Sequence, residues 1–187
     1  MQSSTTAPGE SARAPTENLT GPIPDQLAIS LFSAPATTSI RPTRIELPWP
    51  ELVERLSTHE RRRTKDGRGW SGATYKPGTT RKNVNVVEWS VAGADIEHVT
   101  LDDVQQLCEH LGELDLAYVM YSTYRFEPEE PRVRFAIPLT KAVPAERYPD
   151  AWRRIDAYLF GGKNDPNTKD ASRMLYVPTA PEGAVGT

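Results

Sequence analysis

Two acidic residues, Asp95 and Glu97, end an apolar run that begins at Val86. The run predicts a buried strand over residues 86–97, and side chains two positions apart on a strand point to the same side. We therefore expect both carboxylates at one edge of a sheet. Carboxylate oxygens are preferred ligands of hard divalent cations, and two such ions about 3.5–4 Å apart support in-line phosphoryl transfer. The spacing predicts a site for Mg²⁺ or Mn²⁺, and the alternative is a solvated strand end without a ligand.

Basic residues are concentrated just before this strand, where they alternate with glycine and aromatic residues. Arginine and lysine bind phosphates and aromatic rings stack on bases, so the segment is typical of single-stranded nucleic-acid binding. The alternative is a solvated charged loop. The residues that we expect to bind DNA are Arg61, Arg62, Arg63, Arg68, Trp70 and Lys76.

The apolar pattern from residue 86 onward alternates between strand and helix periodicity. The expected elements are a strand at 86–97, a helix at 101–112, strands at 116–122 and 132–138, a helix at 145–160 and a strand at 174–177. This order is the split βαβ pattern of an α/β (α+β) fold with an RRM-like or ferredoxin-like βαββαβ core. In front of the core we expect a strand at 27–32, a helix at 49–61 and the basic loop.

The topology of that fold brings distant charged residues together. Right-handed crossovers place the first strand between the third and the fourth and antiparallel to both. The end of the first strand, with its two carboxylates, must then lie beside the starts of its neighbours. The charged residues at those starts are Arg132, Arg134, Asp165, Asp170 and Arg173. Acids suited to a metal and arginines suited to phosphate therefore converge at one sheet edge.

The composition is that of an ordinary globular domain. The chain has 187 residues, a net charge of −3 and one cysteine, Cys108, which excludes an internal disulfide. No apolar run is long enough to span a membrane or to form a signal core, so we expect an intracellular, monomeric protein without a membrane partner. Residues 1–24 are rich in small and polar residues and predict a flexible leader before a single domain at 25–187.

Several of these segments resemble the archaeo-eukaryotic primases, specifically the primase-polymerase domains of phage and plasmid replication proteins. The family's first motif, Asp-x-Asp/Glu at a strand end, is matched by residues 95–97, and its third, a single Asp after a helix, by Asp165 or secondly by Asp170. Phage and plasmid members are also similar in residues 121–124 (Tyr-Ser-Thr-Tyr), 131–139 and 170–178. The resemblance covers roughly residues 45–180.

The resemblance implies a DNA primase-polymerase that joins nucleoside triphosphates into primers on a single-stranded DNA template. It implies two Mg²⁺ or Mn²⁺ ions held by Asp95, Glu97 and Asp165. It also implies a bacterial host cytoplasm and a longer replication protein that carries a helicase domain. The residues expected to bind the nucleotide are Arg134, Arg132, Arg173, Ser122 and Lys82.

One residue departs from the family pattern. The second motif is commonly Ser-x-His at the start of a strand that ends in Pro-Leu, and counting back from Pro138 places Arg134 where the histidine stands. A guanidinium preserves phosphate contact but not proton transfer. Two other functions remain open: a replication-initiator nickase, which needs a His-x-His pair that this sequence lacks, and a non-catalytic RRM-like nucleic-acid-binding module, which reads bases with aromatic residues.

Overall fold

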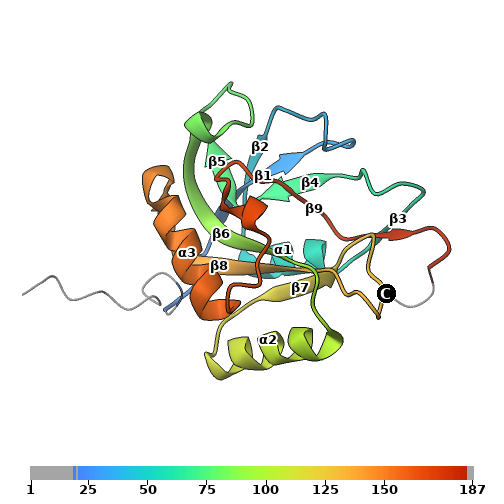
Figure 1. Ribbon diagram of the computed structural model, residues 1–187. Coiled ribbons are helices and arrows are strands. Elements are labelled where there is room, and N and C mark those ends of the chain that lie inside the picture. Colours follow the sequence, from blue (N-terminus) through green and yellow to red (C-terminus); the bar gives the residue numbers. More distant parts are fainter. Residues whose placement is uncertain (1–18, 20, 185–187) are drawn as a thin grey trace, which may run out of the picture.

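The computed structural model describes Leu19 and residues 21–184, which form a mixed α+β fold of antiparallel sheets (Figure 1). One four-stranded sheet has the order β5-β6-β8-β7, and a second has the order β2-β1-β4-β9. The strands of the first are β5 (Ala73–Tyr75), β6 (Val86–Ile96), β8 (Val133–Pro144) and β7 (Val119–Ser122). Those of the second are β2 (Thr43–Leu47), β1 (Leu27–Phe32), β4 (Gly69–Ser71) and β9 (Leu175–Tyr176).

The β5-β6-β8-β7 sheet is covered on both faces. On one side lie helices α2 (Leu101–Glu113) and α3 (Tyr148–Leu159), and their apolar residues share a core with Ile96 and Phe135 of the sheet. On the other side, a second core joins Val91 and Ala136 to the β2-β1-β4-β9 sheet and to helix α1 (Trp49–Leu56). Alternate residues of β6 and β8 therefore face different cores, as the period of two in a strand requires.

The chain passes from one sheet to the other at Gly72, between β4 and β5. A Cβ atom at this position would overlap the carbonyl oxygen of Val91 in β6. Only glycine allows so close an approach of two backbones. The turn lets β5 pair with β6 while β4 pairs with β1, so the two sheets curl around a shared interior.

The α+β class is confirmed, but the expected strand order is only partly formed. β8 lies between β6 and β7 as predicted, whereas β9 pairs with β4 and not with β6. The edge of β6 that we assigned to the last strand is occupied by β5. Residues 73–75, which form β5, were expected to belong to a loop. β5 is close to β6 along the chain, so closing this local hairpin costs less entropy than recruiting a distant strand.

The remaining differences concern the limits of elements. The helix expected at 49–61 ends at Leu56, and the chain forms β3 (Glu60–Arg62), which pairs in parallel with β10 (Thr179–Pro181). Short 3₁₀ turns occur at Asn83–Asn85, Ala145–Arg147 and Pro166–Lys169. Of the expected leader, residues 1–18 and 20 lie outside the described residues, while Leu19 is buried in the core.

Helix α2 begins at the expected position because its N-terminus is capped. The Thr100 hydroxyl accepts a hydrogen bond from the Asp103 amide at 3.1 Å, and the Asp103 carboxylate accepts one from the Thr100 amide at 2.9 Å. This is a capping box. Lys163 Nζ lies 2.7 Å from the same carboxylate and connects α2 to the segment after α3.

The described part of the chain has no helix long and apolar enough to cross a membrane.

Candidate nucleotide-binding cleft

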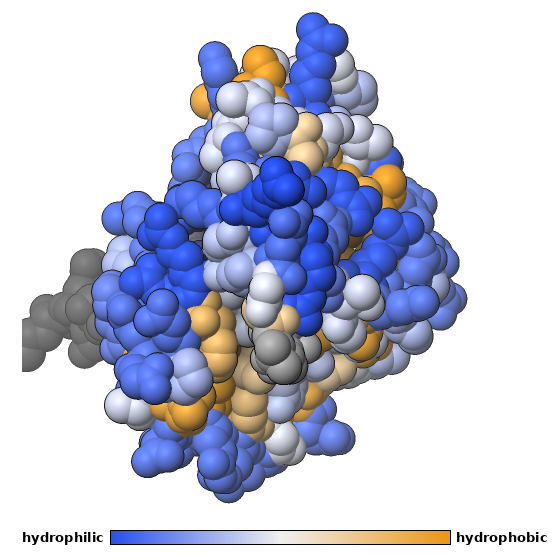
Figure 2. Space-filling view, turned by 90° about the vertical axis from the view of Figure 1, so that its right-hand side faces the viewer, coloured by the Kyte–Doolittle hydropathy of each residue, from blue (hydrophilic) through white to orange (hydrophobic). Residues whose placement is uncertain are grey.

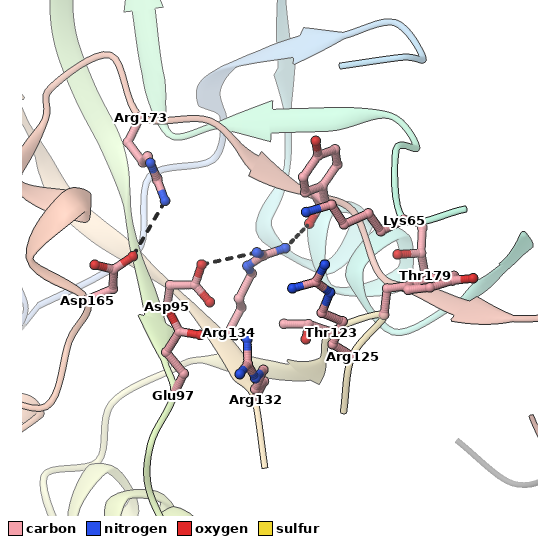
Figure 3. A pocket seen from close by; sticks show the side chains of 12 residues that line it. Lys65, Asp95, Glu97, Thr123, Arg125, Arg132, Arg134, Asp165, Arg173 and Thr179 are labelled. Carbon is pink, nitrogen blue, oxygen red and sulfur yellow. Dashed lines mark hydrogen bonds and ion pairs between the residues drawn. The ribbon is translucent and has the colours of Figure 1, made fainter. Parts of the chain in front are cut away.

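A cleft of about 160 Å³ opens where the C-terminal end of β6 meets the start of β8 and the segment before β9 (Figure 3). Strand pairing explains the position, because Asp95 faces Arg134 across the β6–β8 pair. Figure 2 shows the molecule from the side on which β3 and its partner β10 lie, and hydrophilic side chains gather over the middle of this face. The charged lining residues are Lys65, Asp95, Glu97, Arg125, Arg132, Arg134, Asp165 and Arg173.

Each carboxylate of the cleft faces an arginine. Asp95 Oδ2 lies 3.1 Å from Arg134 Nη2, and Glu97 Oε2 lies 3.1 Å from Arg132 Nη1. Asp165 Oδ2 lies 3.5 Å from Arg173 Nη2. Two further cations, Lys65 and Arg125, also line the cleft. The lining therefore has five cationic and three anionic side chains, a balance that favours an anionic ligand.

The Arg134–Asp95 pair is the most buried of the three. Their side chains are 13% and 11% exposed, so water screens the pair only weakly. Burial acts to lower the pKa of the Arg134 guanidinium, but the charges and hydrogen bonds of Asp95 and Tyr121 together outweigh it, and the pKa is raised above its ordinary value. The arginine therefore stays charged. Its Nε is buried without a hydrogen-bond partner among the described residues.

Tyr176 of β9 helps to hold Arg134. The guanidinium lies 5.9 Å from the centre of the Tyr176 ring, within the range of a cation–π contact, and Nη1 donates to the Tyr176 carbonyl at 3.3 Å. The Tyr176 hydroxyl donates to Asp66 at 3.1 Å. The aromatic ring is thereby fixed by the loop between β3 and β4.

The loop that carries Asp165 is tied directly to the end of β6. The Asp95 amide donates to the Asn164 side chain at 3.0 Å, and the Asp165 amide donates to the Asp95 carbonyl at 2.8 Å. Asp165 is also the N-cap of the following 3₁₀ turn, because one carboxylate oxygen accepts from the Asn167 amide at 2.9 Å. The other carboxylate oxygen faces Arg173. Asp170, the second choice for this role, bonds to Ser172 and does not line the cleft.

The donors fit a divalent cation in type, because all three are carboxylates. Their arrangement is not a preformed metal site: no three His, Cys, Asp or Glu side chains of the described residues are grouped closely enough to hold an ion. The arginines supply the neutralising charge instead. A cation bound here would therefore replace an arginine at each carboxylate that it contacts.

The cleft is small for a whole nucleotide. Sites for small organic ligands are usually about 300–1,000 Å³, larger than the roughly 160 Å³ found here. The space suits phosphate groups, with the sugar and base lying outside it. Arg134 and Arg173 each have a buried Nε without a described partner, so these two donors can reach a phosphate only if the side chains reorient.

The structure brings together six of the residues expected to form the site and leaves others outside it. Those inside are Asp95, Glu97, Arg132, Arg134, Asp165 and Arg173. Ser122 lies next to the cleft, but its hydroxyl is 2.9 Å from His59 Nε2 and does not line it. Lys82 is exposed before the 3₁₀ turn that precedes β6, near the opposite end of that strand.

The arginines of the basic segment are largely engaged by the protein itself. Arg62 and Arg68 both pair with Glu60, and Arg63 Nε lies 3.2 Å from Glu182 Oε2. Arg61 donates to the carbonyl of Ala184 at 2.6 Å. Lys65, which the sequence did not single out, is the member of this segment that enters the cleft.

Trp70 is not available to stack on a base in this structure. Its side chain is buried in the core at 1% exposure, and its indole N–H donates to the Tyr121 hydroxyl at 2.9 Å. Burial raises the pKa of Tyr121 to about 12, so the hydroxyl keeps its proton and donates it to the Tyr176 carbonyl. β4 has only three residues, which is too few for an alternating apolar pattern to predict that Trp70 is buried.

Part of the cleft wall was not assigned to the site from the sequence, although residues 121–124 are among the segments that carry the resemblance. Thr123, Tyr124 and Arg125 follow β7, whose last residues lie beside the start of β8. The predicted strand order contained this information, because β7 and β6 flank β8 and end at the same edge. Tyr176 and Thr179 could not have been found in that way, since they depend on the pairings of β9 and β10.

A comparison with protein-family models matches residues 42–185 to the VapE N-terminal domain. The match includes every residue that lines the cleft. No curated protein and no solved structure matches the chain.

Proposed function

The chain belongs to the VapE N-terminal domain family, a premise from which we propose that it is the primase-polymerase domain of a phage or plasmid replication protein. The proposed reaction is nucleotidyl transfer from nucleoside triphosphates to a growing primer on single-stranded DNA. The family is associated with replication, which supports the biological setting. The observation that carries the chemistry is the convergence of three carboxylates and five cations on one cleft.

The cations of the cleft would bind the triphosphate. Guanidinium groups pair with phosphate oxygens through two parallel hydrogen bonds, and both Arg134 and Arg173 line the cleft. Lys65 and Arg125 lie across the cleft from Arg173 and would neutralise the remaining phosphate charge. Arg134 would take the role of the histidine that is common in the second motif of the archaeo-eukaryotic primases. Because its positive charge is permanent, it contributes electrostatic stabilisation and no proton transfer.

Asp95, Glu97 and Asp165 would hold the divalent ions, Mg²⁺ or Mn²⁺. When bound, such ions lower the pKa of the attacking hydroxyl and neutralise charge on the triphosphate. The carboxylates can receive them only as the arginines turn toward the nucleotide phosphates. Each arginine would then exchange a carboxylate for a phosphate and each carboxylate an arginine for a cation, so every charged group would keep a partner of opposite sign.

The two alternative functions have less support. A non-catalytic module of the RNA-recognition type would bind bases on an open sheet face, but α2 and α3 cover one face of the β5-β6-β8-β7 sheet and β1 and β4 cover the other. A replication-initiator nickase uses a His-x-His pair, and the three histidines here are His59, His98 and His110.

The test is a primer-synthesis assay with labelled nucleotides on a single-stranded template, with either Mg²⁺ or Mn²⁺. We expect template-dependent products in primed and unprimed reactions, and none with chelator present. Ribonucleotides and deoxyribonucleotides are supplied separately to identify the preferred substrate. Cleavage of the template would support the nickase, and binding without incorporation under all conditions would overturn the proposal.

A further inference from the structure

A second groove, of about 450 Å³, lies at the far end of the molecule from the cleft. It is formed by the start of β2 and the segment that connects β5 to β6, whereas the cleft is at the other end of β6. Its charged lining residues are Arg41, Arg44 and Lys76, and no carboxylate is among the described residues that line it. The groove is therefore purely cationic, which the cleft is not.

The positive charge of this groove is only slightly neutralised. One of its three cations has an acidic partner, since Arg44 lies 2.7 Å from Glu46. Lys76 Nζ donates to the uncharged carbonyl of Val84 at 3.0 Å. Arg41 forms no ion pair with a described residue. Near β3, in contrast, three of the four arginines have an acidic partner, because Arg62 and Arg68 pair with Glu60 and Arg63 pairs with Glu182. Arg61, like Lys76, donates to a backbone carbonyl.

Exposed apolar side chains flank the cations. Ile40 and Val84 are 54% and 76% exposed, although each is large enough to favour burial. The two segments are joined, because the Arg81 amide donates to the Ile40 carbonyl at 2.7 Å. Lys76 holds the Val84 segment from the groove side. Apolar surface therefore borders the positively charged groove.

We propose that this groove, and not the arginine-rich segment at 61–68, binds the backbone of the single-stranded DNA template. Sites for single strands combine cations along the phosphate path with side chains, most often aromatic, that contact unpaired bases. The groove has the cations, and the exposed aliphatic side chains of Ile40 and Val84 beside it offer apolar contact to bases. This inference rests on the proposed function for the identity of the strand, and adds where the strand is held.

The groove is suited to the template and not to the incoming nucleotide because of its distance from the carboxylates. β6 separates the two sites by eleven residues, which corresponds to roughly 30–35 Å along an extended strand. A triphosphate in the groove could not reach the cleft. A polymer can occupy both sites, since single-strand binding sites commonly extend over about 4–16 nucleotides.

The experiment compares two variants with equal loss of charge. The groove variant is Arg41→Gln/Lys76→Gln, and the matched control is Arg61→Gln/Arg63→Gln. Binding of a fluorescent 20-nucleotide oligo-dT is measured by anisotropy over a range of salt concentrations, without nucleotide or metal. Thermal unfolding of each variant checks the fold.

We expect the groove variant to weaken binding about tenfold and to lower the slope of log affinity against log salt by about 1.4, since each single-strand phosphate contact contributes about 0.7. The control should retain its slope. Val84→Ser should weaken binding without changing the slope, because it removes an apolar contact and no charge. An unchanged slope in the groove variant, or an equal loss in the control, would overturn the proposal.

The outcome is independent of the proposed enzyme activity. If incorporation fails while the groove variant loses DNA binding, the groove proposal stands and the polymerase proposal does not. If incorporation succeeds and only the control loses DNA binding, the template follows the 61–68 segment instead. Binding of duplex DNA as tightly as of oligo-dT would also overturn the inference, since the apolar border would then contribute nothing.

Discussion

The cleft and the groove are both rich in cations, but they differ in how those cations are balanced. In the cleft, Asp95, Glu97 and Asp165 each face an arginine, so most of the charge is internally paired. In the groove, no described lining residue is acidic. Paired charges can exchange partners when a ligand enters, whereas unpaired cations attract a polyanion from solution. This difference is the basis of our two proposals, which assign chemistry to the cleft and strand binding to the groove.

The largest effect should come from removing one carboxylate of the cleft. Asp95→Asn keeps the shape of the side chain and can still accept a hydrogen bond from Arg134, but it loses the charge needed to hold a cation. We expect nucleotide incorporation to fall more than about a hundredfold, equivalent to more than about 2.7 kcal/mol of transition-state stabilisation. Oligo-dT binding, which depends on the groove, should not weaken.

Asp102→Asn is the matched control for this change, because Asp102 is an exposed residue of α2 outside both regions. It should incorporate nucleotide at the wild-type rate. Asp95→Ala, in contrast, leaves Arg134 buried without its partner and should lower the free energy of unfolding by about 3 kcal/mol. Wild-type incorporation by Asp95→Asn would place the chemistry elsewhere.

The next effect concerns Arg134, which stands where the primase-polymerases that the sequence resembles commonly have a histidine. Arg134→Gln should raise the KM for nucleotide and lower kcat/KM about ten- to hundredfold, because a charged hydrogen bond contributes about 1.5–3 kcal/mol. Arg134→Lys should recover only part of the loss, since an ammonium group cannot pair with phosphate through two parallel bonds. Steady-state kinetics on a primed template measure both. Normal nucleotide kinetics in Arg134→Gln would exclude this arginine from phosphate binding.

A smaller effect tests the exchange of partners directly. If arginines neutralise the carboxylates until phosphates arrive, Mn²⁺ should bind the free protein weakly and bind about tenfold more tightly with a nonhydrolysable nucleotide, a gain of about 1.4 kcal/mol. Arg134→Gln should bind Mn²⁺ more tightly than wild type without nucleotide, because Asp95 is released. Electron paramagnetic resonance of free Mn²⁺ gives both affinities. Equal Mn²⁺ binding with and without nucleotide would contradict the exchange.

The smallest effect should leave both regions unchanged. Thr100→Ala removes the cap of α2 and should lower the free energy of unfolding by about 1 kcal/mol. The Lys163 ammonium, followed by the Thr100 amide and hydroxyl, holds the pKa of Asp103 below its ordinary value of 3.8. A lowered folded-state pKa stabilises the protein above about pH 4, and this contribution is lost as the pH falls through the folded value.

The stability difference between wild type and Asp103→Asn should therefore be largest near neutral pH and should shrink below pH 4. Chemical denaturation at several pH values measures it. Nucleotide and oligo-dT binding should stay at wild-type levels in both cap variants. A change in either would show that α2 is coupled to the cleft or to the groove.

Much of the candidate site was predictable because it depends on a few long, strongly patterned strands. β6 and β8 have continuous apolar runs, and their antiparallel pairing is sufficient to place Asp95 beside Arg134. The Asp165 loop was placed correctly for a different reason from the one expected. It is held by hydrogen bonds to the end of β6, although β9 itself pairs elsewhere.

The strands that the sequence did not predict are short. β4 and β5 have three residues each and flank a glycine, so no alternating pattern can develop in them. Their formation decides that Trp70 is in the core and that the last strand is displaced from β6. The ion pairs could not be predicted from local sequence patterns either, because partners such as Arg63 and Glu182 are 119 residues apart.

Residue patterns alone predicted the α+β class, the order of the principal elements and the convergence of Asp95, Glu97, Arg132 and Arg134 at one edge. These features follow from local periodicity and from the handedness of strand connections, both of which are properties of short segments. The tertiary structure alone decided which cations remain free. Electrostatic neutralisation depends on distance in space, so the arginines that are most prominent in the sequence are largely engaged, while Arg41 and Lys76 face an open groove.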